Sequence, residues 1–405
     1  MAQAPPASPQ LLRRVEALVF VTVFLDLVGF GIVIPLLPFY VQSMGGSAQT
    51  VGILLGCFSF TQLLATPLLG QLSDRHGRRP IILLSLVANA IAMGLFALAS
   101  HQHLLVLLFI SRILAGATAG NLAACQAAIA DSCTPDNRAQ AMGRVGAGIG
   151  LGLVMGPFIG GLLAEWGAWL PPLAAAALAS LGALGVLFAM PETHPPSARL
   201  PSAKSPGRLD ALRATPRRRA LLIVLALYFL VFLGMTNMQV AFALLAQARF
   251  DWSSKEVGYT FAMFGGLALV IQGGLIGPLS RRVGEVRLLV LGALFFSAGL
   301  LGVALAGQAL LLVGSAALIG MGMGLVQPLL SSLASQAASP SHQGVTLGLA
   351  QSSGGLARTV GPVASGALYK SLGASTPFTL GAFVVLLAAA LGALLTHEGL
   401  GKKRS

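Results

Sequence analysis

Twelve long apolar segments limit what this chain can fold into. Each has about 20 residues or more, and a helix of about 20 residues crosses the hydrocarbon core of a bilayer. A soluble core has no use for 56% hydrophobic residues and a mean hydropathy of +0.84. The sequence therefore predicts an all-α membrane protein with 12 transmembrane helices. The segments are residues 15–41, 50–72, 80–99, 103–130, 138–164, 168–190, 220–248, 257–279, 287–306, 308–336, 344–369 and 377–396.

The basic residues orient these segments in the membrane. When successive loops are assigned to alternate sides, 20 of the 25 Lys and Arg residues fall on the side of the N-terminus and 3 on the other. Cytoplasmic loops are enriched in Lys and Arg, so both termini are predicted to be cytoplasmic. The net charge of +13 then reflects topology, and no nucleic-acid partner is expected. We expect a multi-pass protein of the inner or plasma membrane with the lipid bilayer as its surroundings.

A hydrophilic stretch at the midpoint divides the 12 segments into two groups of six. It is rich in Pro, Ser and Arg, a composition typical of linkers. The predicted organisation is a cytoplasmic tail at 1–14, a six-helix bundle at 15–190, a cytoplasmic linker at 191–219, a second six-helix bundle at 220–396 and a cytoplasmic tail at 397–405.

The two predicted bundles share a sequence repeat. Five residues recur 207 positions later, as Gly277, Leu279, Ser280, Arg282 and Gly284 after Gly70, Leu72, Ser73, Arg75 and Gly77. Parallel repeats of this kind are typical of transporters built from two related halves. Asp74 is not repeated, because its counterpart is Arg281.

The loop at residues 70–80 reads GQLSDRHGRRP, between the second and third apolar segments. It resembles the signature loop between helices 2 and 3 of the major facilitator superfamily, where it forms a cytoplasmic latch. The resemblance implies that Asp74 accepts hydrogen bonds near the N-terminus of the eleventh helix, and that Arg75 and Arg78 meet acids at the end of the fourth. A tight, positive-inside turn would explain the glycines and arginines but not an Asp followed by Arg. The residues assigned to this cytoplasmic gate are Gly70, Asp74, Arg75, Gly77, Arg78, Arg79, Asp131 and Arg138.

The first apolar segment carries one carboxylate, Asp26. It lies about 16 Å along the helix from Val15, near the middle of the membrane, where a bare charge is costly. The surrounding sequence, LDLVGFGIVIPLLP, is similar to the first helix of proton-coupled drug exporters of the tetracycline-resistance type. Such an acid is either a structural group, ion-paired or protonated, or a proton carrier. We favour the proton carrier, because acids inside membranes are usually functional.

Arg112, in the fourth segment, is the predicted partner of Asp26. The two helices run in opposite directions, so both residues reach a similar depth. Arg112 and Gly116 resemble a helix 4 motif of the superfamily, R-x-x-Q-G, in which Ala115 replaces the Gln here. Whether Arg112 only neutralises Asp26 or tunes its proton stays open, because both interpretations predict the same contact.

The fifth segment contains a glycine stripe. Gly148, Gly152, Gly156 and Gly160 recur every four residues, which permits close contact with another helix. Pro157 removes one backbone hydrogen bond and can kink the helix. Ordinary small-residue packing is one explanation; the full spacing also resembles the pattern that marks antiporters in the superfamily. That pattern comprises Gly143, Gly152, Gly156, Pro157, Gly160 and Gly161.

Arg358, in the eleventh segment, lies about 20 Å along the helix from Gly344. Two interpretations stay open: binding of an anionic substrate group, and a structural ion pair with Asp26 or Glu165. Methionine, aromatic and polar side chains suit an adaptable substrate site, although most such residues only pack. The candidates for the substrate cavity are Asn121, Gln126, Phe232, Met235, Asn237, Met323, Gln327 and Arg358.

Tetracycline exporters also carry membrane acids in helices 3 and 9. Here the third segment has Asn89 instead and the ninth has no acid, which argues against tetracycline–metal recognition. No H-E-x-x-H or Walker A sequence occurs, so we expect no metal, no cofactor and no enzymatic activity.

The sequence predicts a monomeric, proton-coupled antiporter that exports a hydrophobic or amphiphilic, drug-like small molecule by alternating access. Cationic and zwitterionic compounds are included in that class. Asp26 would carry the proton, and the 70–80 loop would close the cytoplasmic side. The alternatives are a lipid or amphiphile flippase or a metabolite exporter of the same fold and, less favoured, a non-transporting membrane receptor.

Overall fold

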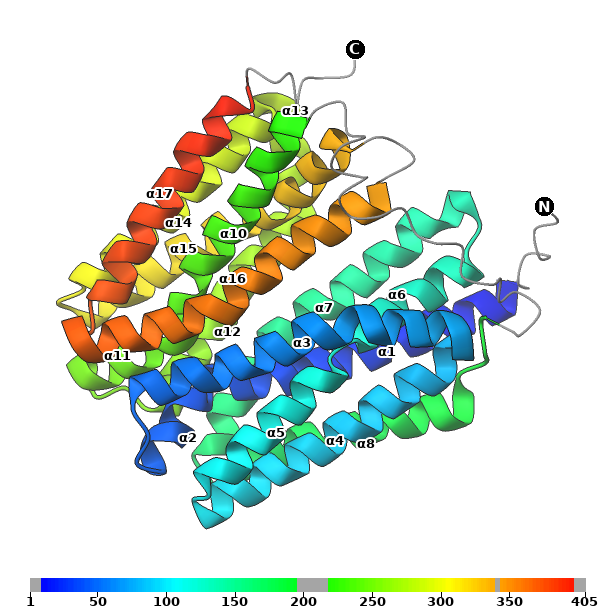
Figure 1. Cartoon of the computed structure of the whole chain (residues 1–405), viewed down its shortest axis with the longest axis horizontal. Coiled ribbons are helices and arrows are strands. Elements are labelled where there is room, and N and C mark those ends of the chain that lie inside the picture. Colours follow the sequence, from blue (N-terminus) through cyan, green and yellow to red (C-terminus); the bar gives the residue numbers. More distant parts are fainter. Residues whose placement is uncertain (1–8, 195–217, 339–342, 397–405) are drawn as a thin grey trace. The chain divides into compact units, whose positions relative to one another are not determined.

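A computed structural model describes residues 9–194, 218–338 and 343–396. Over these residues the chain consists of helices and short connections, without strands (Figure 1). Within these described residues, eleven helices are long and apolar enough to cross a membrane. The remaining predicted segment, the eleventh at 344–369, is the 30-residue helix α16 (Gln343–Leu372), which carries polar residues around Arg358. All 12 predicted segments are therefore helical.

The helices of the first half follow the predicted segments closely. The main difference is at the start, where the first helix begins at Pro9, six residues before the predicted 15 and inside the predicted tail. The elements are α1 (Pro9–Val33), η1 (Ile34–Leu36), α2 (Leu37–Ser43), α3 (Ala48–His76), α4 (Arg78–Gln102), α5 (Leu105–Thr118), α6 (Asn121–Ser132), α7 (Pro135–Ala164) and α8 (Leu170–Ala189).

The second half begins with α10 at Arg218, so the start of the second bundle agrees with the prediction within two residues. Most of the predicted linker and all of the predicted C-terminal tail lie outside the described residues. The remaining elements are α10 (Arg218–Val240), α11 (Phe242–Phe250), α12 (Ser254–Val270), η3 (Ile271–Leu275), α13 (Ile276–Val283), α14 (Glu285–Leu305), α15 (Ala309–Ala337), α16 and α17 (Thr376–Leu394).

Two predicted helices of the first half are interrupted. Pro35 and Pro38, which lack a backbone donor, accompany the 3-10 turn η1 between α1 and α2. The fourth segment breaks between Thr118 and Asn121, giving α5 and α6. The second of these two pieces, α6, packs against α1.

The chain forms two compact units. The first contains the described residues within Met1–Met44, Cys57–Ala203 and Ser254–Ala262, and the second contains those within Gly45–Gly56, Lys204–Ser253 and Met263–Ser405. The predicted bundle boundaries, 15–190 and 220–396, stay a prediction, because two short stretches group with the other unit.

Helix pairing follows the same pattern in both units (Figure 1). In the first, α1 packs against α7 and α8, and α4 packs against α5 and α8. In the second, α10 packs against α16 and α17, and α14 packs against α15 and α17. These five helices of one unit thus have counterparts with equivalent neighbours in the other, as the sequence repeat predicts.

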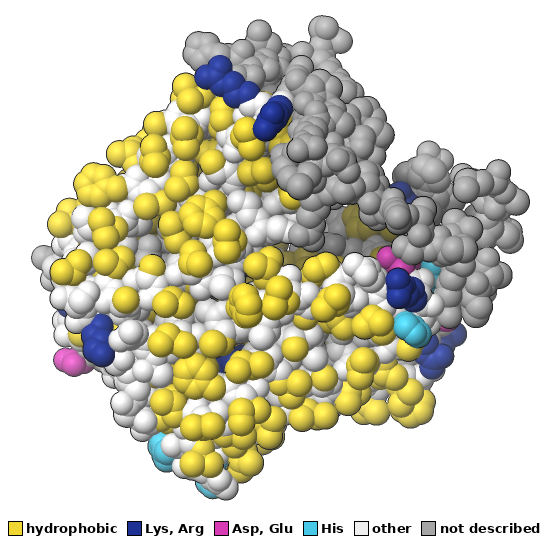
Figure 2. Space-filling view, in the orientation of Figure 1, with side chains coloured by type: hydrophobic (Ala, Val, Ile, Leu, Met, Phe, Trp, Pro, Cys, Tyr) yellow, Lys and Arg dark blue, Asp and Glu magenta, His cyan; other side chains and the backbone are white. Residues whose placement is uncertain are grey.

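Apolar side chains form the core of each unit and also cover much of its outside. One core cluster of the first unit joins α1, α4, α6, α7 and α8 through residues such as Val19, Leu86 and Val186. Figure 2 shows hydrophobic side chains spread over the visible face, and large ones such as Phe188 and Leu310 are exposed. In water such a surface would aggregate, whereas lipid tails solvate it.

Candidate functional site

Asp26 of α1 lies among carboxamide side chains. Its Oδ1 accepts a hydrogen bond from Asn89 Nδ2 of α4 at 3.0 Å. Asn121, the first residue of α6, lies close enough to the Asp26 carboxyl group to influence it electrostatically, although no hydrogen bond joins the two side chains. Only 3% of Asn121 is exposed, and its Nδ2 has no hydrogen-bond partner in the described parts of the chain. Carboxamides both donate and accept, so this environment accommodates Asp26 with or without its proton.

Arg112 lies elsewhere in the same unit. Its guanidinium is 5% exposed, lies 4.6 Å from the centre of the Phe96 ring, and donates from Nη2 to Met93 Sδ at 3.3 Å. Within the described residues no carboxylate comes within ion-pair distance of it. The predicted contact between Arg112 and Asp26 is therefore wrong.

The error has a geometric cause. Helical rise fixes the depth of a residue but not the face of the helix on which it lies. The fourth segment also breaks after Thr118, so α5 and α6 present their side chains independently. As a result, Asn121 rather than Arg112 reaches Asp26.

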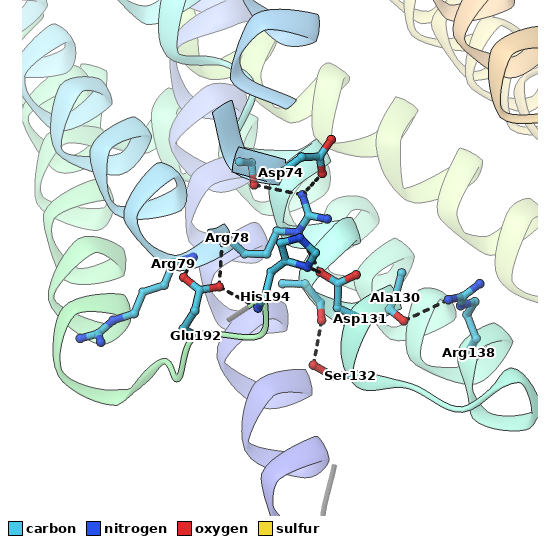
Figure 3. A network of polar contacts seen from close by, with 11 residues as sticks. Asp74, Arg78, Arg79, Ala130, Asp131, Ser132, Arg138, Glu192 and His194 are labelled. Carbon is cyan, nitrogen blue, oxygen red and sulfur yellow. Dashed lines mark hydrogen bonds and ion pairs between the residues drawn. The ribbon is translucent and has the colours of Figure 1, made fainter. Parts of the chain in front are cut away.

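The cytoplasmic loop forms a polar network around Arg78, the first residue of α4 (Figure 3). Gly77, with φ of 107°, makes the turn between α3 and α4, in the region that favours glycine. Arg78 is 7% exposed, and its Nε donates to Asp131 Oδ2 at 2.8 Å. Its Nη1 forms an ion pair with Asp74. The acid that the resemblance implied at the end of the fourth helix is therefore Asp131, in contact with Arg78.

Two members of the network were not anticipated from the sequence. Glu192, after α8, accepts hydrogen bonds from the backbone nitrogens of Arg78 at 2.9 Å and Arg79 at 3.3 Å. The first N–H groups of a helix lack partners within it and favour an anion, so Glu192 caps α4. The His194 backbone nitrogen donates to Glu192 Oε1 at 2.8 Å, and its Nδ1 lies 3.7 Å from Asp131 Oδ2 (Figure 3).

The available sequence signal was an acid directly after the sixth apolar segment, in Pro191-Glu192. Its partners are backbone nitrogens, however, and a pattern of side chains does not reveal those. Glu192 ties the end of α8 to the loop between α3 and α4. The network therefore joins three connections of the first unit: the α3–α4 turn, the end of α6 and the residues after α8.

The other predicted gate residues are less involved. Arg79 Nη2 donates to the carbonyl oxygen of Leu187 at 2.6 Å, and Arg138 Nη2 to that of Ala130 at 3.0 Å. Arg75 is exposed and makes no hydrogen bond or ion pair with any described residue, and a Cβ at Gly70 would meet nothing within 4 Å. The implied contact of Asp74 with the eleventh helix concerns the other unit and stays a prediction.

The glycine stripe of α7 packs directly on α1. A Cβ at Gly152 would lie 2.7 Å from Leu27 Cβ, one at Gly156 would lie 2.7 Å from Gly31 Cα, and one at Gly160 would lie 2.5 Å from the carbonyl oxygen of Ile32. These distances leave no room for a side chain. Gly143 has open space, and Gly161 lies outside the contact with α1.

The predicted cavity residues of the second unit divide into two kinds. Asn237 and Met323 are buried, and Asn237 Nδ2 donates to Gly234 O of its own helix at 3.2 Å. The guanidinium carbon of Arg358 lies 4.8 Å from the centre of the Phe232 ring. The remaining candidates are partly or fully exposed: Gln126 of the first unit, Met235 and Gln327.

Comparisons with known proteins agree with this architecture. The model of the Major Facilitator Superfamily matches residues 19–357 and 224–404. The class C tetracycline resistance protein of Escherichia coli is 33% identical over 86% of this chain and 88% of its own length. The class G protein of Vibrio anguillarum is 31% identical over 89% and 91%.

A solved structure supports the same assignment. That of the human organic anion transporter MFSD10 matches with a TM-score of 0.72 at 28% identity, covering 95% of this chain and all of that one. The family consists of transporters rather than enzymes, and the two bacterial relatives are tetracycline resistance proteins. The chain therefore belongs to the major facilitator superfamily and is a multi-pass transporter of the plasma membrane, similar to tetracycline exporters.

Proposed function

We propose that this transporter is a proton-coupled antiporter that exports hydrophobic or amphiphilic small molecules. The observation that carries the proposal is the environment of Asp26. Its carboxyl group faces Asn89 and Asn121, and no Lys, Arg or His among the described residues of its unit pairs with it. A structural ion pair, the main alternative for an acid inside a membrane, requires such a cation.

The surrounding carboxamides support both protonation states. The charged Asp26 accepts from Asn89 Nδ2, and a protonated Asp26 can donate to a carboxamide oxygen after that side chain turns. Proton binding and cargo binding then each favour a different facing state of the transporter. An inward-directed proton gradient would drive export.

The glycine stripe gives α1 a direct mechanical link to α7. Backbone touches backbone at Gly156 and Gly31, with Asp26 five residues before Gly31 on the same helix. A change in the tilt of α7 therefore moves the helix that carries the proton site. This contact supports the interpretation of the stripe as part of an exchange cycle, beyond simple packing.

The names of the relatives are consistent with export, since two are tetracycline resistance proteins. Tetracycline itself is not proposed as the cargo, because Asn89 occupies the third-helix region in which tetracycline exporters carry an acid. The Asn89 carboxamide is instead bound to Asp26.

Purified protein in liposomes with an acidic lumen tests the proposal. Outward proton flow should drive accumulation of one or more compounds from a panel of amphiphilic drugs, and Asp26→Asn should abolish this accumulation. Asp251→Asn is the matched control, because it makes the same change at the C-cap of α11, outside the middle of the spans. Normal gradient-driven uptake by Asp26→Asn would refute the role of Asp26. Movement of labelled lipid between leaflets without drug uptake would favour a flippase.

A further inference from the structure

Arg358 is a charged residue at the centre of a transmembrane helix. It is residue 16 of the 30 in α16, about 22 Å along the helix from Gln343. A charge at this depth is costly unless a group of opposite charge or hydrogen-bond acceptors compensate it. The group that compensates the charge of Arg358 therefore bears on what the protein binds.

The second unit offers no carboxylate for this purpose in its described residues. Asp251 follows α11 and Glu285 begins α14, so both lie at helix ends. Glu285 already accepts hydrogen bonds from Ser332 Oγ at 2.8 Å and Gln336 Nε2 at 2.7 Å. The structural ion pair that the sequence left open for Arg358 is therefore not found within its unit.

Aromatic side chains hold the guanidinium in place from one side. Its Cζ lies 4.8 Å from the centre of the Phe232 ring, and Phe232 stacks on Tyr228 at 6.1 Å between ring centres. The Tyr228 hydroxyl is hydrogen-bonded to Ser331 Oγ at 2.9 Å, which fixes the other end of the stack. Gly354 makes room for the ring, since a Cβ there would lie 2.9 Å from Phe232 Cδ2.

A cation–π contact orients a guanidinium but does not neutralise it. The five N–H donors of an arginine lie in the plane of the group, away from the stacked face. In the described part of the chain, Arg358 makes no hydrogen bond or ion pair with another side chain or with the backbone. The arrangement is that of a positioned cation without a counter-group among the described residues of its own unit.

We propose that Arg358 binds an anionic group of the cargo, such as a carboxylate or sulfonate. The planar guanidinium suits such groups, because it can donate two parallel hydrogen bonds to them. The inference rests on the proposed function, in which the cargo is an amphiphile, and it narrows that class to compounds with an acidic group. A free inorganic anion such as chloride shares this chemistry and is the alternative occupant.

Two dyes of similar ring system and opposite charge test the proposal: anionic fluorescein and cationic rhodamine 123. Their affinities for the purified full-length protein in detergent are measured by fluorescence anisotropy in chloride-free buffer. Arg358→Gln should weaken fluorescein binding by about 10-fold to 100-fold, the loss expected for charge-assisted hydrogen bonds, and leave rhodamine binding unchanged or tighter. Arg358→Lys should retain part of the fluorescein affinity.

Arg281→Gln is the matched control, because Arg281 is exposed on α13 of the same unit and its loss should change neither affinity. Chloride added to the wild type should compete with fluorescein and not with rhodamine. Unchanged fluorescein affinity in Arg358→Gln, equal weakening of both dyes, or failure of the wild type to bind fluorescein would each overturn the proposal. If the site takes inorganic anions alone, the wild type should bind chloride, and Arg358→Gln should leave the affinity for fluorescein unchanged. No pH gradient is involved, so this result is independent of the liposome test of antiport.

Discussion

Replacing Gly156 with alanine should separate α7 from α1 and destabilise the first unit. The new Cβ would lie 2.7 Å from Gly31 Cα and 2.7 Å from the carbonyl oxygen of Val28. Ordinary contact begins at 3.4 Å, so the helices must move apart locally by the difference between 3.4 and 2.7 Å, about 0.7 Å. Both obstacles are backbone atoms, which cannot turn away as a side chain can.

Overpacking of this kind costs about 1–3 kcal/mol. Alanine recovers up to about 1 kcal/mol through its higher helix propensity, so a net loss is expected. Gly143→Ala is the matched control, because it makes the same change in the same helix where a Cβ meets nothing within 4 Å. Only the propensity gain should remain there, and thermal stability should be equal or higher.

The measurement is thermal unfolding of the purified variants in detergent, followed by loss of the monodisperse peak in size-exclusion chromatography. Gly156→Ala should unfold at a lower temperature than the wild type, and Gly143→Ala should not. Equal stability of the two variants would refute the claim that the stripe is a close contact with α1. Transport by Gly156→Ala should also fall, because the contact links α7 to the helix that carries Asp26.

Three further predictions concern the cytoplasmic network and use the same unfolding assay. Asp131→Asn removes one carboxylate from the nearly buried Arg78 and should lower the free energy of unfolding by about 1–3 kcal/mol. Asp131→Glu, which keeps the charge, should lower it less. Wild-type stability in Asp131→Asn would contradict a stabilising contact between Arg78 and Asp131. Glu192→Gln removes the anion at the start of α4 and should lower the free energy of unfolding by about 0.5–2 kcal/mol. The Arg78 and Arg79 amides should also lose protection from hydrogen exchange. Unchanged exchange at these amides would show that the cap is unimportant. Gly77→Ala, at φ of 107°, should cost about 1–2 kcal/mol, whereas Gly70→Ala, with open space, should cost less; the reverse order would contradict the assigned turn.

The positions of the membrane helices were predictable because bilayer thickness fixes the length of an apolar helix. The same reasoning failed for α1, which starts at Pro9, because hydropathy does not report where a helix begins outside the lipid. The turn at Gly77 and the contact of Arg78 with Asp131 were also within reach. The turn depends on short-range geometry at a glycine, whereas the contact of Arg78 with Asp131, 53 residues further along the chain, was implied by the resemblance of the 70–80 loop to the superfamily signature.

The contact predicted for Arg112 failed because it required knowledge of helix rotation. Depth followed from helical rise, but the face did not, and the break between α5 and α6 was invisible in the apolar pattern. The sequence drew attention to Asn89 only because tetracycline exporters carry an acid in this helix. In the structure its carboxamide donates a hydrogen bond directly to Asp26. The capping role of Glu192 was missed because its partners are backbone nitrogens. Nearly every residue has one, so the sequence does not reveal which of them a carboxylate will reach.

Asp26 is expected to exchange a proton in response to cargo. This expectation is tested most directly by adding the panel compound with the strongest uptake to the detergent-purified protein in weakly buffered solution and measuring the pH change across a range of starting pH. The wild type and the control Asp251→Asn should release protons on binding. Asp26→Asn should bind the compound and release none. Proton release by Asp26→Asn equal to that of the wild type would contradict the account.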